Sequence, residues 1–388
     1  MTIEGLPVVT GMGMLSSLGG DAAANWDNLC AGQRGFRPVT LFDTAKFRSP
    51  LGGEVEGEYP RTGKERMAAF GRQALIEALQ SAGLSADELD MNKTAIVVGT
   101  SLGHLFENEE GAVPLDEFMP IMLKAAGLQV PYFTLSTACS SGSDSVAIGM
   151  DLIAFMQYDV VLCGGIDVLD KYKMSGHSSL QTQSPTACTP FSIHTDGTTL
   201  GEGAAFLVLE SGSHAQRRGA RPLARAAGRS STTDTQSVTA PDETGGGAIR
   251  AIRQALAQSD YEPDQVAYVN AHGSGTPTND AMEAVVYDAL FKNEFIPVSS
   301  TKAAVGHTLG ATGTLEAVVT VQALLHHEAP PTAGLDEVAA AWSGANTVKG
   351  EAAAIRSGGP TLSVTYGFGG ANTCLVFDAF RPQEEESV

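Results

Sequence analysis

Two similar segments, one in each half of the chain, restrict its fold more than any other feature of the sequence. Residues 136–156 (STACSSGSDSVAIGMDLIAFM) and 300–325 (STKAAVGHTLGATGTLEAVVTVQALL) both begin with Ser-Thr, continue with small residues and end in a long helical pattern. A helix with small or apolar residues on most sides is usually buried. We therefore predict an internal duplication, divided into residues 1–220 and 221–388, whose two buried helices pack against each other.

Short apolar runs that end at glycine or in polar turns lie around these helices. Such runs predict buried strands, whereas runs with one apolar face predict helices. The predicted strands cover residues 7–14, 94–99, 132–137, 159–165, 204–210, 266–270, 362–366 and 373–377, with a strand and loop over 222–234, and the flanking helices cover 65–83 and 246–258. Strands mixed with helices, and 44 glycines among 388 residues for tight turns, favour an α/β enzyme.

The charge and cysteine content exclude several classes of protein. With 44 acidic and 24 basic residues, the formal net charge of −20 argues against nucleic acid or an anionic membrane as the main partner. No apolar run is long enough to cross a bilayer, and the first residues show no signal peptide. Five widely spaced cysteines without a C-x-x-C pair argue against a disulfide framework or a structural zinc site. We expect a cytoplasmic protein.

Cys139 is the candidate nucleophile. It lies in TACSSG, between a predicted strand and the first buried helix. A thiol at this place meets unpaired backbone N–H groups and the positive end of the helix dipole, and both favour the reactive thiolate. The alternative is a buried cysteine that only packs, which is favoured for Cys163 and Cys374 inside apolar strands.

Two histidines leave predicted strands into loops rich in Gly, Ser and Thr. They are His272 in NAHGSGTPTND and His307 in STKAAVGHTLGATG. Such positions suit acid–base chemistry or donation to an oxyanion, and the alternative is a histidine bonded only to backbone groups. The remaining histidines have no motif around them or are expected at the surface: His104, His177, His194, His214, His326 and His327.

Lys302 and Glu316 are flanked by small or apolar residues. A buried lysine needs an anionic partner, so these two residues are candidates for a buried ion pair, and the alternative is two exposed charges. The glycines of YGFGGANT (366–373) would let backbone amides approach a ligand closely. We find no clustering of His, Cys and carboxylates that predicts a metal site.

Taken in order, these segments resemble the signature segments of the β-ketoacyl synthases, the condensing enzymes of fatty-acid and polyketide assembly in the thiolase superfamily. The resemblance covers nearly the whole chain and rests on VVTGMGMLSSLG (8–19), TACSSG, DGTTLGEGAAFLVLE (196–210), NAHGSGTPTND, SSTKAAVGHTLGATGTLEA and YGFGGANT. It implies an α/β, thiolase-like fold whose duplicated βαβαβαββ halves form a five-layer α-β-α-β-α sandwich. The first half would carry the nucleophile and the second the two histidines.

The resemblance also implies a role for each candidate residue. Cys139 corresponds to the acyl-accepting nucleophile, and His272 and His307 correspond to the pair that binds the malonyl thioester carbonyl. Lys302 and Glu316 match the buried ion pair that supports the site.

Further positions follow from the same resemblance. Phe368 matches a mobile gating phenylalanine, and its amide would form an oxyanion hole with that of Cys139. Ser274, Thr276 and Gly369 occupy substrate-binding positions, the first two beside the phosphopantetheine arm.

The implied reaction is a decarboxylative condensation of a Cys-bound acyl group with malonyl-acyl carrier protein. The Cys-His-His set favours an elongating enzyme of a type II fatty-acid or, more strongly, a polyketide or polyene pathway. No metal or redox cofactor is implied, and the substrates are carried on the phosphopantetheine of an acyl carrier protein. The implied assembly is a homodimer, or a heterodimer with a ketosynthase-like chain-length-factor subunit. Alternatives are an acyltransferase without decarboxylation and a pocket-shaping partner subunit.

Two features differ from the pattern typical of the family. The stretch between the predicted strand 94–99 and Cys139, which includes the predicted loop 104–116, is shorter than is typical and acidic, where the family has basic carrier-docking residues. The segment 184–197 has Ser192, Ile193 and His194 where charged residues are usual. The basic residues left for docking are Arg61, Lys64, Arg66, Lys171 and Lys173. The alternative for these residues is an ordinary solvated surface.

Overall fold

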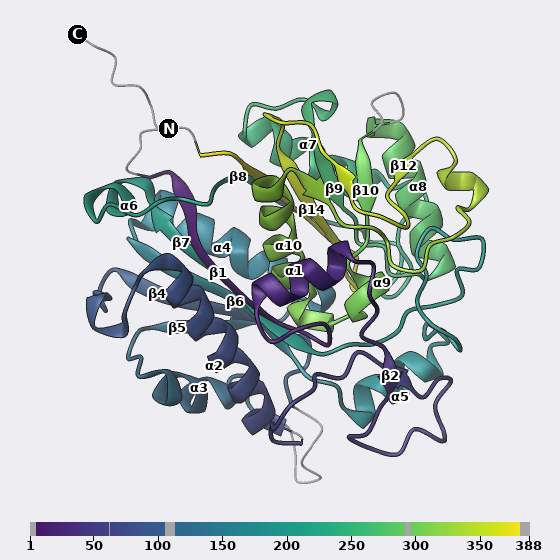
Figure 1. The fold of residues 1–388 in the computed structure, drawn as a ribbon, viewed down its shortest axis with the longest axis horizontal. Helices are drawn as coiled ribbons and strands as arrows, with labels where there is room; N and C mark the ends of the chain where they lie inside the picture. Colours follow the sequence, from purple (N-terminus) through teal and green to yellow (C-terminus); the bar gives the residue numbers. More distant parts are fainter. Residues whose placement is uncertain (1–4, 62, 105–112, 292–295, 381–388) are drawn as a thin grey trace.

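One strand–helix pattern occurs twice along the chain (Figure 1). The computed structural model describes residues 5–61, 63–104, 113–291 and 296–380. The first repeat consists of β1 (Pro7–Leu15), α2 (Gly63–Ala82), β4 (Thr94–Gly99), α3 (Phe118–Ala126), β5 (Tyr132–Leu135), α4 (Ser141–Met156), β6 (Val160–Asp167) and β7 (Gly203–Ser211). The second consists of β8 (Ala224–Thr233), α7 (Gly246–Gln258), β9 (Tyr268–Asn270), α8 (Pro277–Phe291), β10 (Pro297–Ser299), α10 (Thr312–His326), β14 (Thr361–Tyr366) and β15 (Ala371–Asp378). Both have the predicted order βαβαβαββ.

Shorter elements connect these repeats. They are α1 (Ala22–Cys30), β2 (Arg37–Pro38), β3 (Leu51–Gly52), α5 (Lys171–Ser179), α6 (Gly212–Arg217), α9 (Lys302–Val305), β11 (Glu328–Ala329), β12 (Asn346–Thr347), β13 (Ala353–Ala354) and the 3-10 turns η2 (Ala86–Glu88), η3 (Ala138–Ser140), η4 (Pro263–Gln265), η5 (Leu309–Ala311) and η6 (Ala340–Trp342). The predicted boundary at residue 220 lies between α6 and β8 and stays a prediction. Within the acidic stretch predicted as a loop, residues 105–112 lie outside the described residues, and 113–116 contain no helix or strand.

The main sheet has the strand order β12-β10-β9-β14-β15-β8-β1-β7-β6-β4-β5. The strands of each repeat follow the same spatial order, third, second, fourth, fifth and first. The two repeats meet where β1 and β8 pair over only two residue pairs, Val8 with Arg225 and Val9 with Ala224. The predicted duplication is therefore present in the strand topology.

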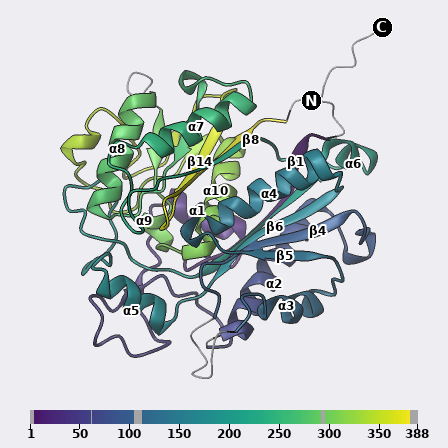
Figure 2. The same cartoon turned by 180° about the vertical axis from the view of Figure 1, so that it is seen from behind.

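Helices form three layers around the two halves of this sheet (Figure 2). The helices α2 and α3 cover one outer face, α7 and α8 cover the other, and α4 and α10 lie together between the halves. This confirms the predicted five layers and the predicted contact between the two buried helices. The contact requires glycine, because a Cβ added at Gly142 would lie 2.7 Å from the backbone nitrogen of Thr314.

The two central helices begin in the same way. Each follows a 3-10 turn, η3 before α4 and η5 before α10. The first residue of each turn has a positive φ, 55° at Ala138 and 52° at Leu309. Non-glycine residues seldom adopt this conformation, so both turns are held by the surrounding structure. Among the described helices, none is long and apolar enough to cross a membrane.

Candidate active site

Cys139 lies in the turn η3, at the start of α4, and lines a pocket. Its side chain is buried, and the N–H of Phe368 bonds its sulfur. Burial raises the pKa of the thiol to about 11, against the smaller opposing effects of that N–H and of the Lys302 charge. The sequence analysis named two local influences that favour the thiolate, backbone N–H groups and the helix dipole. Burial, which that reasoning did not include, has the larger effect on this pKa.

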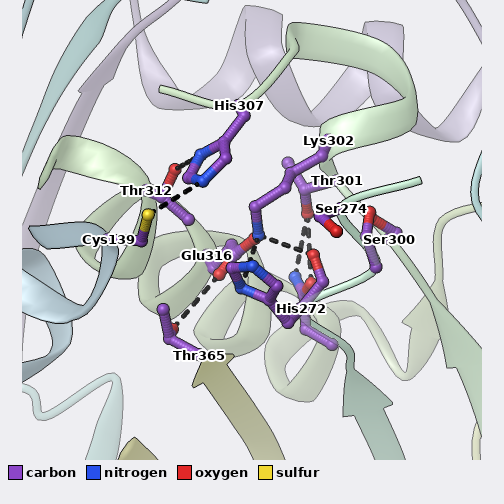
Figure 3. Close-up of polar contacts among 12 residues, drawn as sticks. Cys139, His272, Ser274, Ser300, Thr301, Lys302, His307, Thr312, Glu316 and Thr365 are labelled. Atoms are coloured by element: carbon purple, nitrogen blue, oxygen red, sulfur yellow. Dashed lines mark hydrogen bonds and ion pairs between the residues drawn. The ribbon is translucent and has the colours of Figure 1, made fainter. Parts of the chain in front are cut away.

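His307 contacts the nucleophile directly. Its Nε2 lies 3.1 Å from Sγ of Cys139 (Figure 3). Its Nδ1 accepts the N–H of Leu309 at 3.1 Å and lies 3.0 Å from Oγ1 of Thr312. Because Nδ1 accepts a backbone hydrogen, the neutral ring carries its own proton on Nε2. Burial and the Lys302 charge keep the pKa of His307 well below its usual range, so the ring is neutral.

His272 has the same arrangement on the other side of the pocket. Nζ of Lys302 lies 3.2 Å from its Nδ1, and a lysine ammonium can only donate. The neutral His272 ring therefore also carries its proton on Nε2. Burial, with the neighbouring Lys302 charge, lowers its pKa well below the ordinary value. The rings of His272 and His307 are 5.5 Å apart and nearly perpendicular.

Lys302 and Glu316 form the predicted buried ion pair. The ammonium donates to Glu316, to the carbonyl of His272 at 2.6 Å and to Nδ1 of His272, so its three hydrogens are all used. Burial raises the pKa of Glu316 to about 7, although the Lys302 ammonium opposes this shift. Thr365 donates to the second oxygen at 3.5 Å. The pair therefore fixes the orientation of the His272 ring through the contact of Lys302 with Nδ1.

Two carboxylates missed by the sequence analysis hold the His272 loop. Glu283 accepts the N–H groups of His272 at 2.9 Å and Gly273 at 2.6 Å, and Asp280 accepts the N–H of Gly275 at 3.3 Å. Burial raises the pKa of Glu283 to about 8 and that of Asp280 to about 6. The signal was their spacing of three residues at the start of a helix, directly after the His272 loop.

The other predicted substrate-binding residues lie around the same pocket, with one exception. Phe368, Ser274 and Thr276 line it together with Cys139, and the two hydroxyl oxygens are 2.9 Å apart. Gly369 is exposed and does not line the pocket, where Gly370 lies instead.

A third histidine lines the pocket without having been predicted there. His177 on α5 has no motif around it, but its ring stacks on Phe368 with centroids 5.7 Å apart. Only the tertiary contact between α5 and Phe368, in the loop after β14, brings it there. Within the described residues, no group of three or more His, Cys, Asp or Glu is arranged to hold a metal ion.

The predicted basic docking surface is partly wrong. Arg66 is buried in an ion pair with Glu202, and Lys173 is buried in one with Asp167. Lys64 bonds Glu117 at 3.0 Å. Only Arg61 and Lys171 of this set remain exposed without an ion pair to a described residue, since tertiary partners neutralise the others.

The sequence of the chain is similar to those of known proteins over most of its length. The chain matches the family models "Beta-ketoacyl synthase, N-terminal domain" over residues 8–215 and "Beta-ketoacyl synthase, C-terminal domain" over residues 223–336. It is 32% identical to 3-oxoacyl-[acyl-carrier-protein] synthase 2 of Vibrio cholerae, covering 95% of this chain and 98% of that one. It is 33% identical to the tetracenomycin polyketide synthase ketoacyl synthase alpha subunit of Streptomyces glaucescens, covering 85% of this chain and 87% of that one.

Solved structures are similar over almost the whole length. The ishigamide ketosynthase/chain length factor has a TM-score of 0.88 and 28% identity, with coverage of 97% of this chain and 99% of that chain. A beta-ketoacyl synthase from Burkholderia phymatum has a TM-score of 0.87 and 29% identity, with coverage of 97% and 100%. With both family domains matched in order and the thiolase-like topology present, the chain belongs to the β-ketoacyl synthase family.

Proposed function

We propose that this chain is an elongating β-ketoacyl synthase that condenses a Cys139-bound acyl group with a malonyl unit carried by an acyl carrier protein. The observation that carries this proposal is the geometry of the two histidines. His272 and His307 are neutral, and each has its proton on Nε2 because Nδ1 is already an acceptor. Two such N–H donors in the same pocket as the Cys139 sulfur suit a reaction that develops negative charge on a carbonyl oxygen.

The first step is acyl transfer to Cys139. Sγ attacks the thioester carbon of an acyl carrier protein, the bond from carbon to the carrier sulfur breaks, and the thiol proton leaves with the carrier thiol. The pKa of about 11 makes the free thiolate scarce. The N–H of Phe368 and Nε2–H of His307 both point at the sulfur and would stabilise its charge during attack. We assign the amides of Cys139 and Phe368 to the acyl oxyanion.

The second step is decarboxylation. The malonyl thioester carbonyl accepts both Nε2–H groups, the carbon–carboxylate bond breaks, and its electron pair becomes the enolate. The enolate carbon attacks the acyl-Cys139 carbonyl, the bond to Sγ breaks, and the thiolate takes up a proton from water. These bond changes are redox-neutral and need no cofactor beyond the phosphopantetheine arm, which we place beside Ser274 and Thr276.

The proposed partners are an acyl carrier protein and a second ketosynthase-fold subunit. β5 ends the main sheet, and its outer edge pairs with no described strand. Phe133 on β5 is 49% exposed. One similar structure is a ketosynthase in complex with its chain length factor from Xenorhabdus doucetiae, at 27% identity and a TM-score of 0.81 over 97% of this chain and 98% of that chain. We infer that the chain forms a homodimer or such a heterodimer in the cytoplasm. We favour a polyketide or polyene pathway over fatty-acid synthesis.

The test uses the purified chain with acyl- and malonyl-carrier protein, with and without a candidate partner subunit. Intact mass follows loading, and labelled carbon dioxide follows decarboxylation. Cys139→Ala should abolish loading, whereas His307→Ala should spare loading and block condensation. Loading without decarboxylation by the wild type would indicate a plain acyltransferase. No loading at all would indicate a pocket-shaping subunit, and either result would overturn the proposal.

A further inference from the structure

One wall of the pocket carries three polar side chains that the proposed reaction does not use. His177, Thr182 and Thr198 line the same pocket as Cys139. The His177 ring stacks on Phe368 and lies edge-on to His307, with centroids 6.4 Å apart. A third imidazole therefore lies next to the histidine that contacts the nucleophile.

Hydrogen bonds determine which nitrogen of His177 is left as an acceptor. Nδ1 lies 2.9 Å from Oγ1 of Thr182, and that hydroxyl donates to the His177 carbonyl at 3.2 Å. The hydroxyl has one hydrogen for two acceptors, and when the carbonyl takes it, the Thr182 oxygen accepts Nδ1–H. Burial lowers the pKa of His177 to about 4, so the ring is neutral near pH 7. Nε2 then keeps a lone pair, and none of the described residues bonds it.

Thr198 supplies the second unpaired group. Its side chain is 1% exposed, and its Oγ1 has no hydrogen-bond partner in the described part of the chain. A buried hydroxyl without a partner is unfavourable, so a ligand group or a water molecule is expected there. The backbone N–H of Thr198 donates to the Thr182 carbonyl at 2.7 Å, which joins the two threonines in one framework.

The helix that carries His177 is held firmly. Asp170 caps the start of α5 by accepting the N–H groups of Tyr172 and Lys173. The buried Lys173 ammonium bonds Asp167 and the carbonyl of Gly103. A polar group mounted on such an element is pre-organised for a ligand.

We propose that His177 and Thr198 form a subsite for a hydroxyl group next to the thioester carbonyl of the acyl group or of the extender unit. The subsite rests on the proposed function. The hydroxyl donates to Nε2 of His177 and accepts from Thr198. His307 is the common neighbour of His177 and of Sγ, so the recognised hydroxyl lies close to the carbonyl and not at a distal chain end. An alkyl group at this place would leave both polar atoms unpaired, which favours the hydroxylated substrate.

Competition assays test this in two arms. In the loading arm, 2-hydroxybutyryl- and butyryl-carrier thioesters compete for Cys139, and intact mass measures which acyl group is bound. In the extender arm, hydroxymalonyl and methylmalonyl thioesters compete for decarboxylation. In one arm we expect the hydroxylated thioester to be used about tenfold more than its competitor. The arm that shows this preference identifies whether the acyl group or the extender unit carries the recognised hydroxyl. His177→Phe keeps a ring but removes Nε2, and it should bring that ratio to about one, as should Thr198→Val.

The matched variants separate recognition from folding. His177→Gln places an amide within reach of the Nε2 position and should restore part of the preference, whereas His194→Phe, on an exposed loop, should leave it unchanged. If His177→Phe does not fold, the preference of Thr198→Val for the hydroxylated over the plain substrate tests the subsite instead. Equal use of hydroxylated and plain substrates by the wild type in both arms overturns the subsite while condensation stands. Failure to load any substrate instead overturns the proposed function.

Discussion

Replacing Lys302 with Met separates two consequences of its hydrogen bonds. Lys302 balances the buried carboxylate of Glu316, and it also holds the His272 proton on Nε2. Breaking a buried ion pair from one side costs about 3–5 kcal/mol. Because burial raises the pKa of Glu316 to about 7, the carboxyl takes up a proton when Lys302 is lost. We therefore expect the free energy of unfolding to fall by the lower figure, about 3 kcal/mol.

The catalytic consequence is independent of this loss. Without the ammonium, the His272 proton can move to Nδ1, and the ring then presents a lone pair to the enolate. Loss of one pre-organised donor lowers rates by about 10²–10³-fold. We expect malonyl decarboxylation by Lys302→Met to fall by about 10²-fold, at the lower end, because the ring still donates for part of the time.

A double variant distinguishes the two effects. Lys302→Met with Glu316→Leu replaces the whole pair by apolar side chains, so urea unfolding should return close to the wild-type free energy. Release of labelled carbon dioxide from malonyl-carrier protein should stay low, and acyl loading by intact mass serves as the control for a folded site. If decarboxylation recovers together with stability, Lys302 does not position His272 and the reasoning is refuted.

Three further outcomes follow from burial and close packing. The rate at which iodoacetamide alkylates Cys139 should rise about tenfold for each pH unit from about pH 7 to about pH 10, because burial raises the pKa of the thiol to about 11 and the thiolate fraction is still rising. Peptide mass spectrometry measures this rate. A rate that stops rising below about pH 8 would contradict a protonated resting thiol. Arg66→Ala should lower the unfolding free energy in urea by about 3–5 kcal/mol and leave carrier affinity unchanged, since the guanidinium lies in a buried ion pair; weaker carrier binding by the folded variant would speak for a docking role. Gly142→Ala should lower the free energy of unfolding by about 1–3 kcal/mol, because the added Cβ would lie 2.7 Å from the backbone nitrogen of Thr314. An unchanged Tm in calorimetry would refute that close approach.

Local sequence patterns were sufficient for most of the fold. Apolar runs marked the strands of both repeats except β10, and the two segments of small residues marked the central helices. The helices α3 and α8 were not predicted. The chemistry of Cys139 was less accessible, because its pKa depends on how completely distant segments exclude water from the sulfur. A helix start can be recognised from neighbouring residues, whereas burial depends on the whole fold.

Contacts between distant residues account for what the sequence analysis missed. Arg66 meets a carboxylate 136 residues away, so its burial leaves no local trace. His177 reaches the pocket because α5 packs beside Phe368, and nothing in its neighbouring residues indicates that contact. Glu283 is the intermediate case, since its helical spacing from the His272 loop could have been recognised.

The turn that presents the nucleophile has a counterpart that cannot act in the same way. In the second repeat, Gly310 occupies the place in η5 that Cys139 occupies in η3. A Cβ at Gly310 would lie 2.1 Å from the backbone nitrogen of Ser101, so no side chain fits there. Although the fold contains two such turns, only the one in the first repeat carries a side chain that can bind an acyl group covalently. Saturation with acyl donor should therefore stop at one acyl group per chain, a stoichiometry that intact mass counts directly.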